Sequence, residues 1–431
     1  MRKSAVVSLA SLLSALSLSA GTAHAADGYF LIGYGARQKA LAGAGVADSR
    51  DAMALSVNPA GIAGLERQFQ TAMTAIIAER GYVTTGRPRV VAAGDVRSGR
   101  PLFPVPNSGY AQHIDETSSW GLASYANGGM NTSYSFWNFR APYGGPLGGG
   151  FAGVDLQQGF FSLGYAKRFD TALGQVSIGV APTVAVQMIN VQGLNQFAPL
   201  STNQWELTDM GYDWSYGGGV RGGLEWRITQ ALRFGFAASS PMFMSRLDKY
   251  SGLFAEAGKF DIPATLQAGL AYDVLPNLTV MADWRHIFYS AIPTLGNPST
   301  PATRFSLGGF AGPGFGWRDT DSGAAGAEWR ATSQLTLRAG YHYTAGALRP
   351  DSVTVNILAP IVNRHHVGGG FNYRITKNSS VDFTTVYAFK NSVTGPEYIP
   401  QSPGLPFGAY NPFATITPWG KGVEFTLGYV Y

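Results

Sequence analysis

The sequence predicts an all-β fold: a transmembrane antiparallel β-barrel of about 14 strands with an N-terminal hatch, or plug, in its lumen. Three observations lead to this prediction. Apolar and polar residues alternate along many segments, short turns alternate with long connections, and one segment near the N-terminus is unusually rich in Gly and Ala.

The composition favours a sheet with exposed apolar area. Aromatic residues make up 13% of the chain and charged residues only 13%, about half the usual charged share of a soluble protein. Beyond residue 25 no run of about 18 apolar residues occurs, which excludes helical membrane spans. The absence of Cys excludes disulfides and thiolate metal sites. A net charge of +5 without a concentrated basic face argues against nucleic acid as a partner.

Residues 1–25 have the features of a secretory signal peptide. Arg2 and Lys3 form a positive start, residues 5–20 are apolar, and Ala23-His24-Ala25 is a small-residue cleavage site. We therefore expect export and a mature chain that begins at Ala26.

Residues 26–65 are expected to form the hatch. The stretch from 33 to 65 is dense in Gly and Ala, carries Asp48 and Asp51, and ends in Asn58-Pro59-Ala60-Gly61. Pro59 fixes φ and the Asn58 side chain can close a local hydrogen bond, so these four residues predict a turn. Small residues allow backbone to lie close to other backbone, as a compact plug requires.

Residues 66–431 are expected to form the barrel. In the last strand the odd positions from Val423 to Tyr431 are apolar, whereas Gly422, Glu424, Thr426 and Gly428 fill the even positions. This period of two places apolar side chains on one face. It recurs within residues 176–187, 278–288, 335–343 and 381–390.

The connections distinguish a membrane barrel from a soluble sandwich. Short turns alternate with long connections, as they do between the two rims of an outer-membrane barrel, and the hairpins after Glu66 give about 14 strands. A barrel of this size has a lumen too wide for its own side chains to fill, so we expect the hatch to fill it. The long connections span residues 79–101, 138–156, 189–213, 240–262, 288–323, 345–362 and 391–420.

The order of signal peptide, Gly/Ala/Asp segment, Asn-Pro-Ala turn and hairpins up to an aromatic end resembles the FadL/TodX outer-membrane transport proteins over essentially the whole chain. The resemblance implies a Gram-negative outer-membrane channel that takes up long-chain fatty acids or other hydrophobic compounds, such as aromatic hydrocarbons. In that family a kink in the third strand opens the wall sideways. The matching stretch here contains Asn127, Gly128 and Gly129, where adjacent glycines favour a bulge; simple barrel curvature is the alternative.

Two long loops carry apolar residues at a rim where water would be expected. Residues 241–258 predict an amphipathic helix, with Arg246 and Lys249 off its apolar face. In the family the third and fourth outer loops form a hydrophobic groove that first captures the ligand; packing of the two loops on each other is the alternative. The candidate capture residues are Phe197, Leu200, Trp205, Phe243, Leu247, Tyr250 and Phe254.

The resulting hypothesis is passive uptake, since no nucleotide motif or energy-coupling box is visible. An amphiphile lands on the groove, enters a lumenal site lined by Tyr29 and Phe30, and leaves through the gap beside Gly128. Arg246 or Lys249 meets a carboxylate headgroup. The expected partners are a fatty acid or another hydrophobic small molecule and the surrounding lipid and lipopolysaccharide, with the protein itself a monomer.

Two other classes of protein remain possible. A surface-binding protein, such as an adhesin or phage receptor, would not need the hatch. An outer-membrane hydrolase would need a catalytic spacing that the Ser, His and Asp residues do not show, so we expect no enzyme activity, no cofactor and no metal site. His286 and His342 lie in predicted strands and are expected to be hydrogen-bonded residues of the lumen.

Overall fold

The computed structural model describes residues 27–135, 147, 150–300, 306–399 and 409–431. The predicted signal peptide, residues 1–25, lies outside the described residues.

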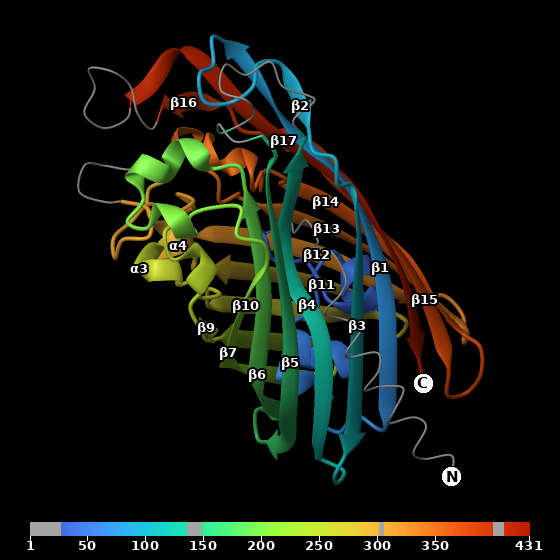
Figure 1. Ribbon diagram of the computed structural model, residues 1–431. Helices are drawn as coiled ribbons and strands as arrows, with labels where there is room; N and C mark the ends of the chain where they lie inside the picture. The colour runs from blue at the N-terminus through green and yellow to red at the C-terminus, as the bar shows by residue number, and fades with distance from the viewer. Residues whose placement is uncertain (1–26, 136–146, 148–149, 301–305, 400–408) are drawn as a thin grey trace, which may run out of the picture.

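A closed ring of fourteen antiparallel strands forms the wall in the part of the chain that the structure describes (Figure 1). Consecutive wall strands pair with each other, and β1 closes the ring by pairing with β17 from Gln70↔Val430 to Gly86↔Ala414. The wall strands are β1 (Gln68–Gly86), β3 (Leu102–His113), β4 (Ser118–Tyr134), β5 (Ala152–Thr171), β6 (Gly174–Gln192), β7 (Asp213–Arg227), β8 (Leu232–Ser239), β10 (Thr265–Leu275), β11 (Leu278–Ile287), β12 (Thr320–Arg330), β13 (Leu335–Thr344), β14 (His365–Arg374), β15 (Ser380–Ser392) and β17 (Ala409–Val430). Three short strands pair with wall strands: β2 (Asp95–Arg97) with β1, β9 (Phe243–Met244) with β7, and β16 (Gly395–Ile399) with β17. The predicted fold class is confirmed.

The alternation of residues places apolar side chains on the outside of the ring. On β17, Phe425, Leu427 and Tyr429 are exposed, whereas Thr426 points inward and pairs with Thr74 at 2.9 Å between the two hydroxyl oxygens. Closure of the ring pairs the strand edges, as a sheet in hydrocarbon requires, except between β3 and β4, whose ladder stops at Asn107↔Tyr125. Among the described residues, no helix has both the length and the apolar character needed to cross a membrane.

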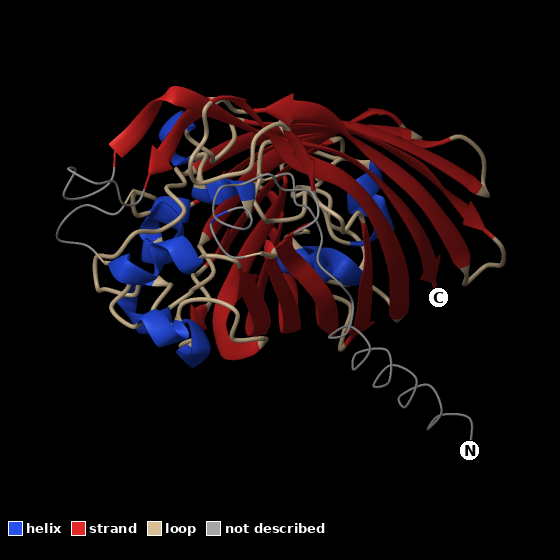
Figure 2. Cartoon of the chain, turned by 45° about the horizontal axis from the view of Figure 1, so that its top comes forward, coloured by secondary structure: helices blue, strands red, loops and turns tan. Residues whose placement is uncertain are grey.

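The two ends of the barrel differ. Short turns join the strands at the end where the C-terminus lies, which we call the short-turn end. Long connections with short helices gather at the opposite long-loop end (Figures 1 and 2). The helices there are η5 (Asn195–Leu200), η6 (Gln204–Glu206), η7 (Asp248–Tyr250), α3 (Ala255–Gly258), η8 (Tyr289–Ala291), α4 (Pro293–Gly296), η9 (Pro350–Ser352) and η10 (Val355–Ile357).

The amphipathic helix predicted for residues 241–258 is wrong. This stretch forms β9, η7 and α3 instead, and Glu256 and Ala257 have φ of 56° and 57°. Their backbone N–H groups donate to Gly309 and Gly308, and the N–H of Leu247 donates to the carbonyl of Gly258. Hydrogen bonds with another loop thus replace those of a helix.

Residues 27–65, the N-terminal segment, lie inside the ring (Figures 1 and 2). The segment contains α2 (Gly35–Ala40), η1 (Ala52–Ser56) and η2 (Pro59–Ile62), and almost all of its residues are buried. Helix α2 contacts β13, β14, β15 and β17, whereas η2 contacts β4 to β7. Wall glycines allow this approach: a Cβ on Gly340 would lie 2.3 Å from the carbonyl carbon of Leu41, and one on Gly235 would lie 2.3 Å from the carbonyl oxygen of Val46.

Candidate functional site

The first residues of the N-terminal segment pair with a bulge in β4. The β4–β5 register shifts between Ala126 and Gly128, which leaves Asn127 as an extra residue. The N–H of Leu31 donates to the carbonyl of Asn127 at 3.2 Å, and the N–H of Gly129 donates to the carbonyl of Tyr29 at 3.1 Å. The predicted bulge is therefore present, and residues 29–31 of the N-terminal segment cover it from the lumen.

Only glycine fits at the centre of this contact. A Cβ on Gly128 would lie 1.8 Å from the carbonyl oxygen of Tyr29. The backbones of β4 and the N-terminal segment therefore touch, and a larger residue at position 128 would push residues 29–31 away from the wall.

Tyr29 and Phe30 are buried in an aromatic cluster in the lumen. Their rings stack with centroids 5.1 Å apart, and the Tyr29 ring lies 5.7 Å from Tyr289 and 5.9 Å from Trp317. Such pairs add stability beyond the burial of their area. Neither residue lines the two cavities described below.

Asp27 fixes the start of the segment to the opposite side of the wall. Its fully buried carboxylate accepts hydrogen bonds from Ser322 at 3.1 Å and contacts His342 Nε2 at 2.8 Å and Arg285 at 3.5 Å. Its backbone carbonyl accepts from the Tyr289 hydroxyl. Burial by itself would raise the pKa of Asp27, but His342 and Arg285 outweigh it and lower the pKa to about 2. The side chain is therefore a carboxylate at neutral pH.

Sequence reasoning did not find Asp27, because its partners are 258 to 315 positions away along the chain. The expectation for His342 is confirmed, since it is buried and contacts Asp27. The expectation for His286 is wrong. It lies on the outward face of β11, next to Trp284, and pairs with Asp321 at 2.9 Å. Its even position in β11 is the reason, since the odd positions Asp283 and Arg285 point inward.

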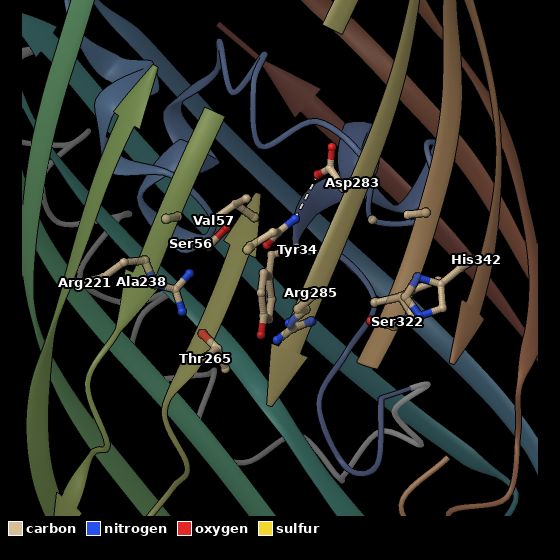
Figure 3. A pocket seen from close by; sticks show the side chains of 15 residues that line it. Tyr34, Ser56, Val57, Arg221, Ala238, Thr265, Asp283, Arg285, Ser322 and His342 are labelled. Atoms are coloured by element: carbon tan, nitrogen blue, oxygen red, sulfur yellow. Dashed lines mark hydrogen bonds between the residues drawn. The ribbon is translucent and has the colours of Figure 1, made fainter. Parts of the chain in front are cut away.

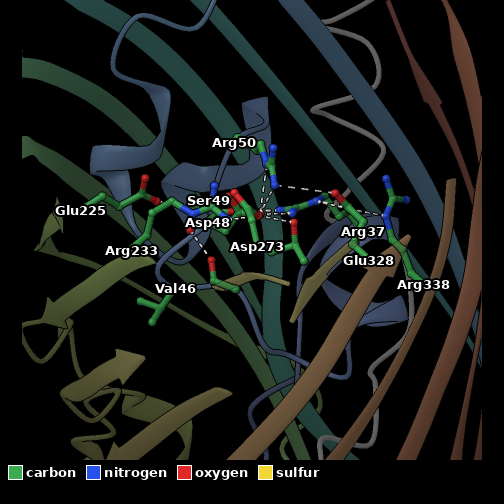
Figure 4. Close-up of polar contacts among 12 residues, drawn as sticks. Arg37, Val46, Asp48, Ser49, Arg50, Glu225, Arg233, Asp273, Glu328 and Arg338 are labelled. Carbon is green, nitrogen blue, oxygen red and sulfur yellow. Dashed lines mark hydrogen bonds and ion pairs between the residues drawn. The ribbon is translucent and has the colours of Figure 1, made fainter. Parts of the chain in front are cut away.

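An ion network joins the middle of the segment to the wall (Figure 4). Arg37 is buried and pairs with Asp48 at 2.8 Å and with Glu328 at 2.9 Å. Arg338 pairs with the same Glu328 at 2.8 Å. Burial would lower the pKa of Arg37, but the carboxylates of Glu328 and Asp48 raise it above its ordinary value, so Arg37 stays charged. Asp48 also contacts Arg50 at 2.6 Å and Arg233 at 3.7 Å.

The Asn58-Pro59-Ala60-Gly61 turn closes the segment on the wall. Asn58 is fully buried; its side-chain oxygen accepts from Ala60 N–H at 3.1 Å, and its side-chain nitrogen donates to the carbonyls of Val46 at 2.7 Å and Leu224 at 3.0 Å. Pro59 begins η2. A Cβ on Gly61 would lie 1.8 Å from a backbone oxygen of the same segment. The predicted turn is present.

An apolar cavity of about 60 Å³ lies among the long loops. Two of the candidate capture residues, Phe197 and Phe254, line it from different loops. Its other lining residues include Leu194, Leu253, Leu307 and Phe315.

The remaining candidates do not line this cavity. Leu247 and Tyr250 are buried beside the loops, and the Tyr250 hydroxyl donates to the carbonyl of Gly211 at 2.6 Å. Leu200 is half-buried, whereas Trp205 and Phe243 are 80% and 64% exposed. Arg246 and Lys249 are exposed, and the Lys249 amine donates to the carbonyl of Tyr212 at 2.7 Å.

A second, polar cavity of about 20 Å³ lies between the N-terminal segment and the wall (Figure 3). Its lining includes Tyr34, Arg221, Asp283, Arg285 and His342. Sequence reasoning did not find this cavity, because its lining comes from six wall strands and the segment. Across the described residues, no group of three or more His, Asp or Glu side chains is arranged to hold a metal ion.

A closed barrel with an apolar exterior and a lumen occupied by residues 27–65 of the same chain is the architecture of an outer-membrane channel. Residues 17–401 match the family of outer membrane protein transport proteins (OMPP1/FadL/TodX), and the chain belongs to this family. Its members are transport channels, not enzymes, and they carry hydrophobic compounds across the Gram-negative outer membrane. The predicted family, location and lack of enzyme activity are thus confirmed.

Solved structures agree on the fold. The P. putida toluene transporter TodX is 15% identical, with a TM-score of 0.65 over 92% of this chain and 98% of that chain. A Pseudomonas aeruginosa FadL homologue is 16% identical, with a TM-score of 0.64 over 94% and 99%. The Ralstonia pickettii toluene transporter TbuX is 18% identical, with a TM-score of 0.60 over 91% and 98%. No curated protein sequence matches this chain significantly.

Proposed function

We propose that this channel takes up long-chain fatty acids or other hydrophobic compounds, such as aromatic hydrocarbons, and releases them sideways into the membrane. The substrate first enters the apolar cavity between the loops that carry Phe197 and Phe254. It then passes the aromatic cluster around Tyr29 and Phe30 and leaves at the bulge of β4. Transport is passive, driven by the concentration gradient of the substrate.

The observation that carries this proposal is the contact between residues 29–31 and the bulge. At most positions a wall strand hydrogen-bonds only to its two neighbours, but at Asn127 and Gly129 the backbone of β4 bonds to the N-terminal segment instead. The β3–β4 ladder ends at Asn107↔Tyr125, so these bonds occupy the side of β4 that β3 leaves unpaired, and a small shift of residues 29–31 exposes that gap. Gly128 has no side chain to fill that gap.

In the same proposal, residues 26–65 act as a hatch that blocks the direct path along the barrel axis. The segment contacts wall strands on all sides of the lumen, and the ion pairs of Arg37 and Asp48 are buried. Moving the whole segment would break these pairs together with the hydrogen bonds of Asn58. Moving residues 29–31 breaks far fewer contacts, which favours a sideways exit.

Deletion of Asn127 tests the exit. The deletion removes the residue whose carbonyl accepts from Leu31, and with it the bulge at which residues 29–31 meet β4. Inward positions stay inward on both sides of the deletion. We expect uptake of a hydrophobic substrate into vesicles to be lost. The barrel should still fold, as judged by the change in its gel mobility on heating. Gly159→Leu is the matched control: Gly159 pairs with Ala126 beside the bulge, and a Cβ there meets no atom within 4 Å. Normal uptake by a folded deletion variant would exclude the sideways exit.

The substrate class needs a direct comparison. Proteoliposomes would be offered a fatty acid, an alkylbenzene and a sugar, and we expect uptake of at least one of the first two and none of the sugar. Transporters of toluene among the structural neighbours support the alkylbenzene arm. The exposed cations Arg246 and Lys249 support a carboxylate headgroup at the outer rim. We also propose that the protein works as a monomer surrounded by lipid and lipopolysaccharide.

The competing proposal is a surface-binding protein such as an adhesin or phage receptor. Such a protein presents its loops and has no use for the segment in its lumen. Deletion of residues 26–65 would then leave binding intact, whereas in a channel it would change permeability.

A further inference from the structure

The polar cavity of Figure 3 lies where the N-terminal segment meets the wall. The segment contributes Ile32, Tyr34 and Ser56 to its lining, and wall strands contribute Arg221, Arg285 and other polar residues. Its volume is about 20 Å³, and roughly 10–15 Å³ on this measure holds one water molecule. The space therefore suits one small ligand.

Arg221 is the unusual group in this cavity. It lies on the inward face of β7 and is 6% exposed, yet within the described residues its guanidinium forms no hydrogen bond and no ion pair. Figure 3 shows Arg221 and Arg285 on either side of Tyr34 and Thr265. A buried charge without a partner is strongly unfavourable, and no described carboxylate lies within ion-pair distance of Arg221.

Asp283 is the carboxylate in the lining, and neutral donors hold it in place. One carboxylate oxygen of Asp283 accepts from the backbone N–H groups of Gly45 at 3.0 Å and Val46 at 2.9 Å, and from Gln267 at 2.9 Å. Asp27 does not line the cavity, but its carboxylate lies 3.5 Å from the guanidinium of Arg285, which does. Arg285 is thus paired with Asp27, whereas no carboxylate of the described residues lies within ion-pair distance of Arg221, so the unpaired charge at the cavity is positive and favours an anion beside Arg221.

Two further polar atoms in the lining also lack a partner. These are the second carboxylate oxygen of Asp283, Oδ1, and Nδ1 of His342, both buried. Buried polar atoms are nearly always hydrogen-bonded to protein or to a bound molecule. A carboxylate oxygen only accepts hydrogen bonds, so Asp283 Oδ1 indicates a bound donor such as water in the cavity, in addition to the group that faces Arg221.

We propose that this cavity is a binding site for a small monovalent anion, with Arg221 as its principal partner. The chemistry fits a halide or one carboxylate group, because a guanidinium binds both through charge-assisted hydrogen bonds. Two sources supply such a group: a free anion from solution, or the carboxylate end of a transported amphiphile. The second source rests on the proposed transport function, whereas the first does not.

Bromide tests the site itself. Crystals of the full protein grown in sodium bromide are expected to show anomalous density next to Arg221, and crystals of Arg221→Gln are expected to show none. Arg374→Gln is the matched control, because Arg374 is exposed at the short-turn end, far from the lumen. Absence of bromide from the wild-type cavity would mean that water fills it, and would overturn the proposal.

Octanoate and octanol separate the two sources. If a substrate headgroup uses the site, the wild-type protein binds octanoate at least about tenfold more tightly than octanol, and Arg221→Gln removes this preference without changing the affinity for octanol. Bromide density without a preference for octanoate assigns the site to a free anion. If Arg221→Gln does not fold, loss of wild-type bromide density on addition of octanoate makes the same assignment. Uptake of an uncharged alkylbenzene reports on transport separately, so failure of the anion site and failure of the proposed function are distinguishable.

Discussion

Replacement of Arg37 by Met should loosen the N-terminal segment without unfolding the barrel. The Arg37 guanidinium donates to the Asp48 carboxylate at 2.8 Å, to the Asp48 carbonyl at 2.6 Å and to Glu328 at 2.9 Å. Met has a similar length but no charge, so all three contacts are lost while most of the packing is kept.

The free-energy cost of Arg37→Met depends on the ion pairs that remain after the substitution. Removal of one partner from a buried ion pair costs about 3–5 kcal/mol because it leaves the other charge uncompensated. Glu328 still contacts Arg338 at 2.8 Å, and Asp48 still contacts Arg50 at 2.6 Å. The cost therefore falls at the lower end, about 3 kcal/mol, which is roughly a 150-fold rise in the population with residues 35–48 detached.

Hydrogen exchange measured by mass spectrometry is the direct assay, because exchange of a locally opened segment tracks the free energy of that opening. Peptides that cover residues 35–48 should exchange roughly 150-fold faster in Arg37→Met, whereas wall peptides should not change. Arg374→Met serves as the control with one cation removed at the exposed short-turn end. In the double variant Arg37→Met/Glu328→Gln, the loss of free energy that holds the segment should be smaller than the sum of the losses in the two single variants. Exchange in residues 35–48 within twofold of wild type would refute the idea that this network holds the segment.

The other predictions concern separate contacts. The pKa of Asp27 is lowered from 3.8 to about 2, so its carboxylate contributes about 2 kcal/mol to holding residues 27–31. This contribution is complete above about pH 4 and disappears as the pH falls through about 2. Hydrogen exchange of residues 29–31 should therefore be slower in the wild type than in Asp27→Asn at pH 5, and the two rates should converge near pH 2. Asn58→Ala should lower the free energy of unfolding by about 2–3 kcal/mol in denaturant titrations, because it leaves buried partners of three hydrogen bonds unsatisfied; an unchanged midpoint would contradict this. Phe254→Ala enlarges the apolar cavity and should weaken binding of a hydrophobic ligand about tenfold or more in fluorescence titrations. The control is Trp205→Ala, because that side chain is 80% exposed and lies outside the cavity, so the affinity should change little. Equal losses of affinity in the two variants would mean that the ligand is captured elsewhere.

The wall could be predicted from the sequence because its signal is local. Period-two alternation is set by neighbouring residues, and on β17 it correctly assigned Phe425 and Leu427 to the outside and Thr426 to the lumen. The two glycines after Asn127 likewise indicated the bulge. The helix predicted for residues 241–258 failed because spacing of apolar residues cannot reveal hydrogen bonds to another loop.

The contacts inside the lumen could not be predicted from patterns of neighbouring residues. Arg221 and Tyr34 line one cavity although almost 190 residues separate them in the sequence. Asp27 is an unremarkable acidic residue until the fold brings His342 to it. What the sequence did reveal was the kind of packing: a segment of small residues that fits closely against glycines of the wall.

The contacts of α2 have a consequence for biogenesis. The carbonyl of Ala36 accepts from Thr384, 348 positions later in the chain, and Lys39 pairs with Glu424, 385 positions later. Because these partners lie on β15 and β17, helix α2 cannot reach its final position until those two strands have taken theirs. A polypeptide that lacks β17 would therefore lose both the pairing that closes the ring and the contact of Lys39, and residues 27–65 would be more open to proteases.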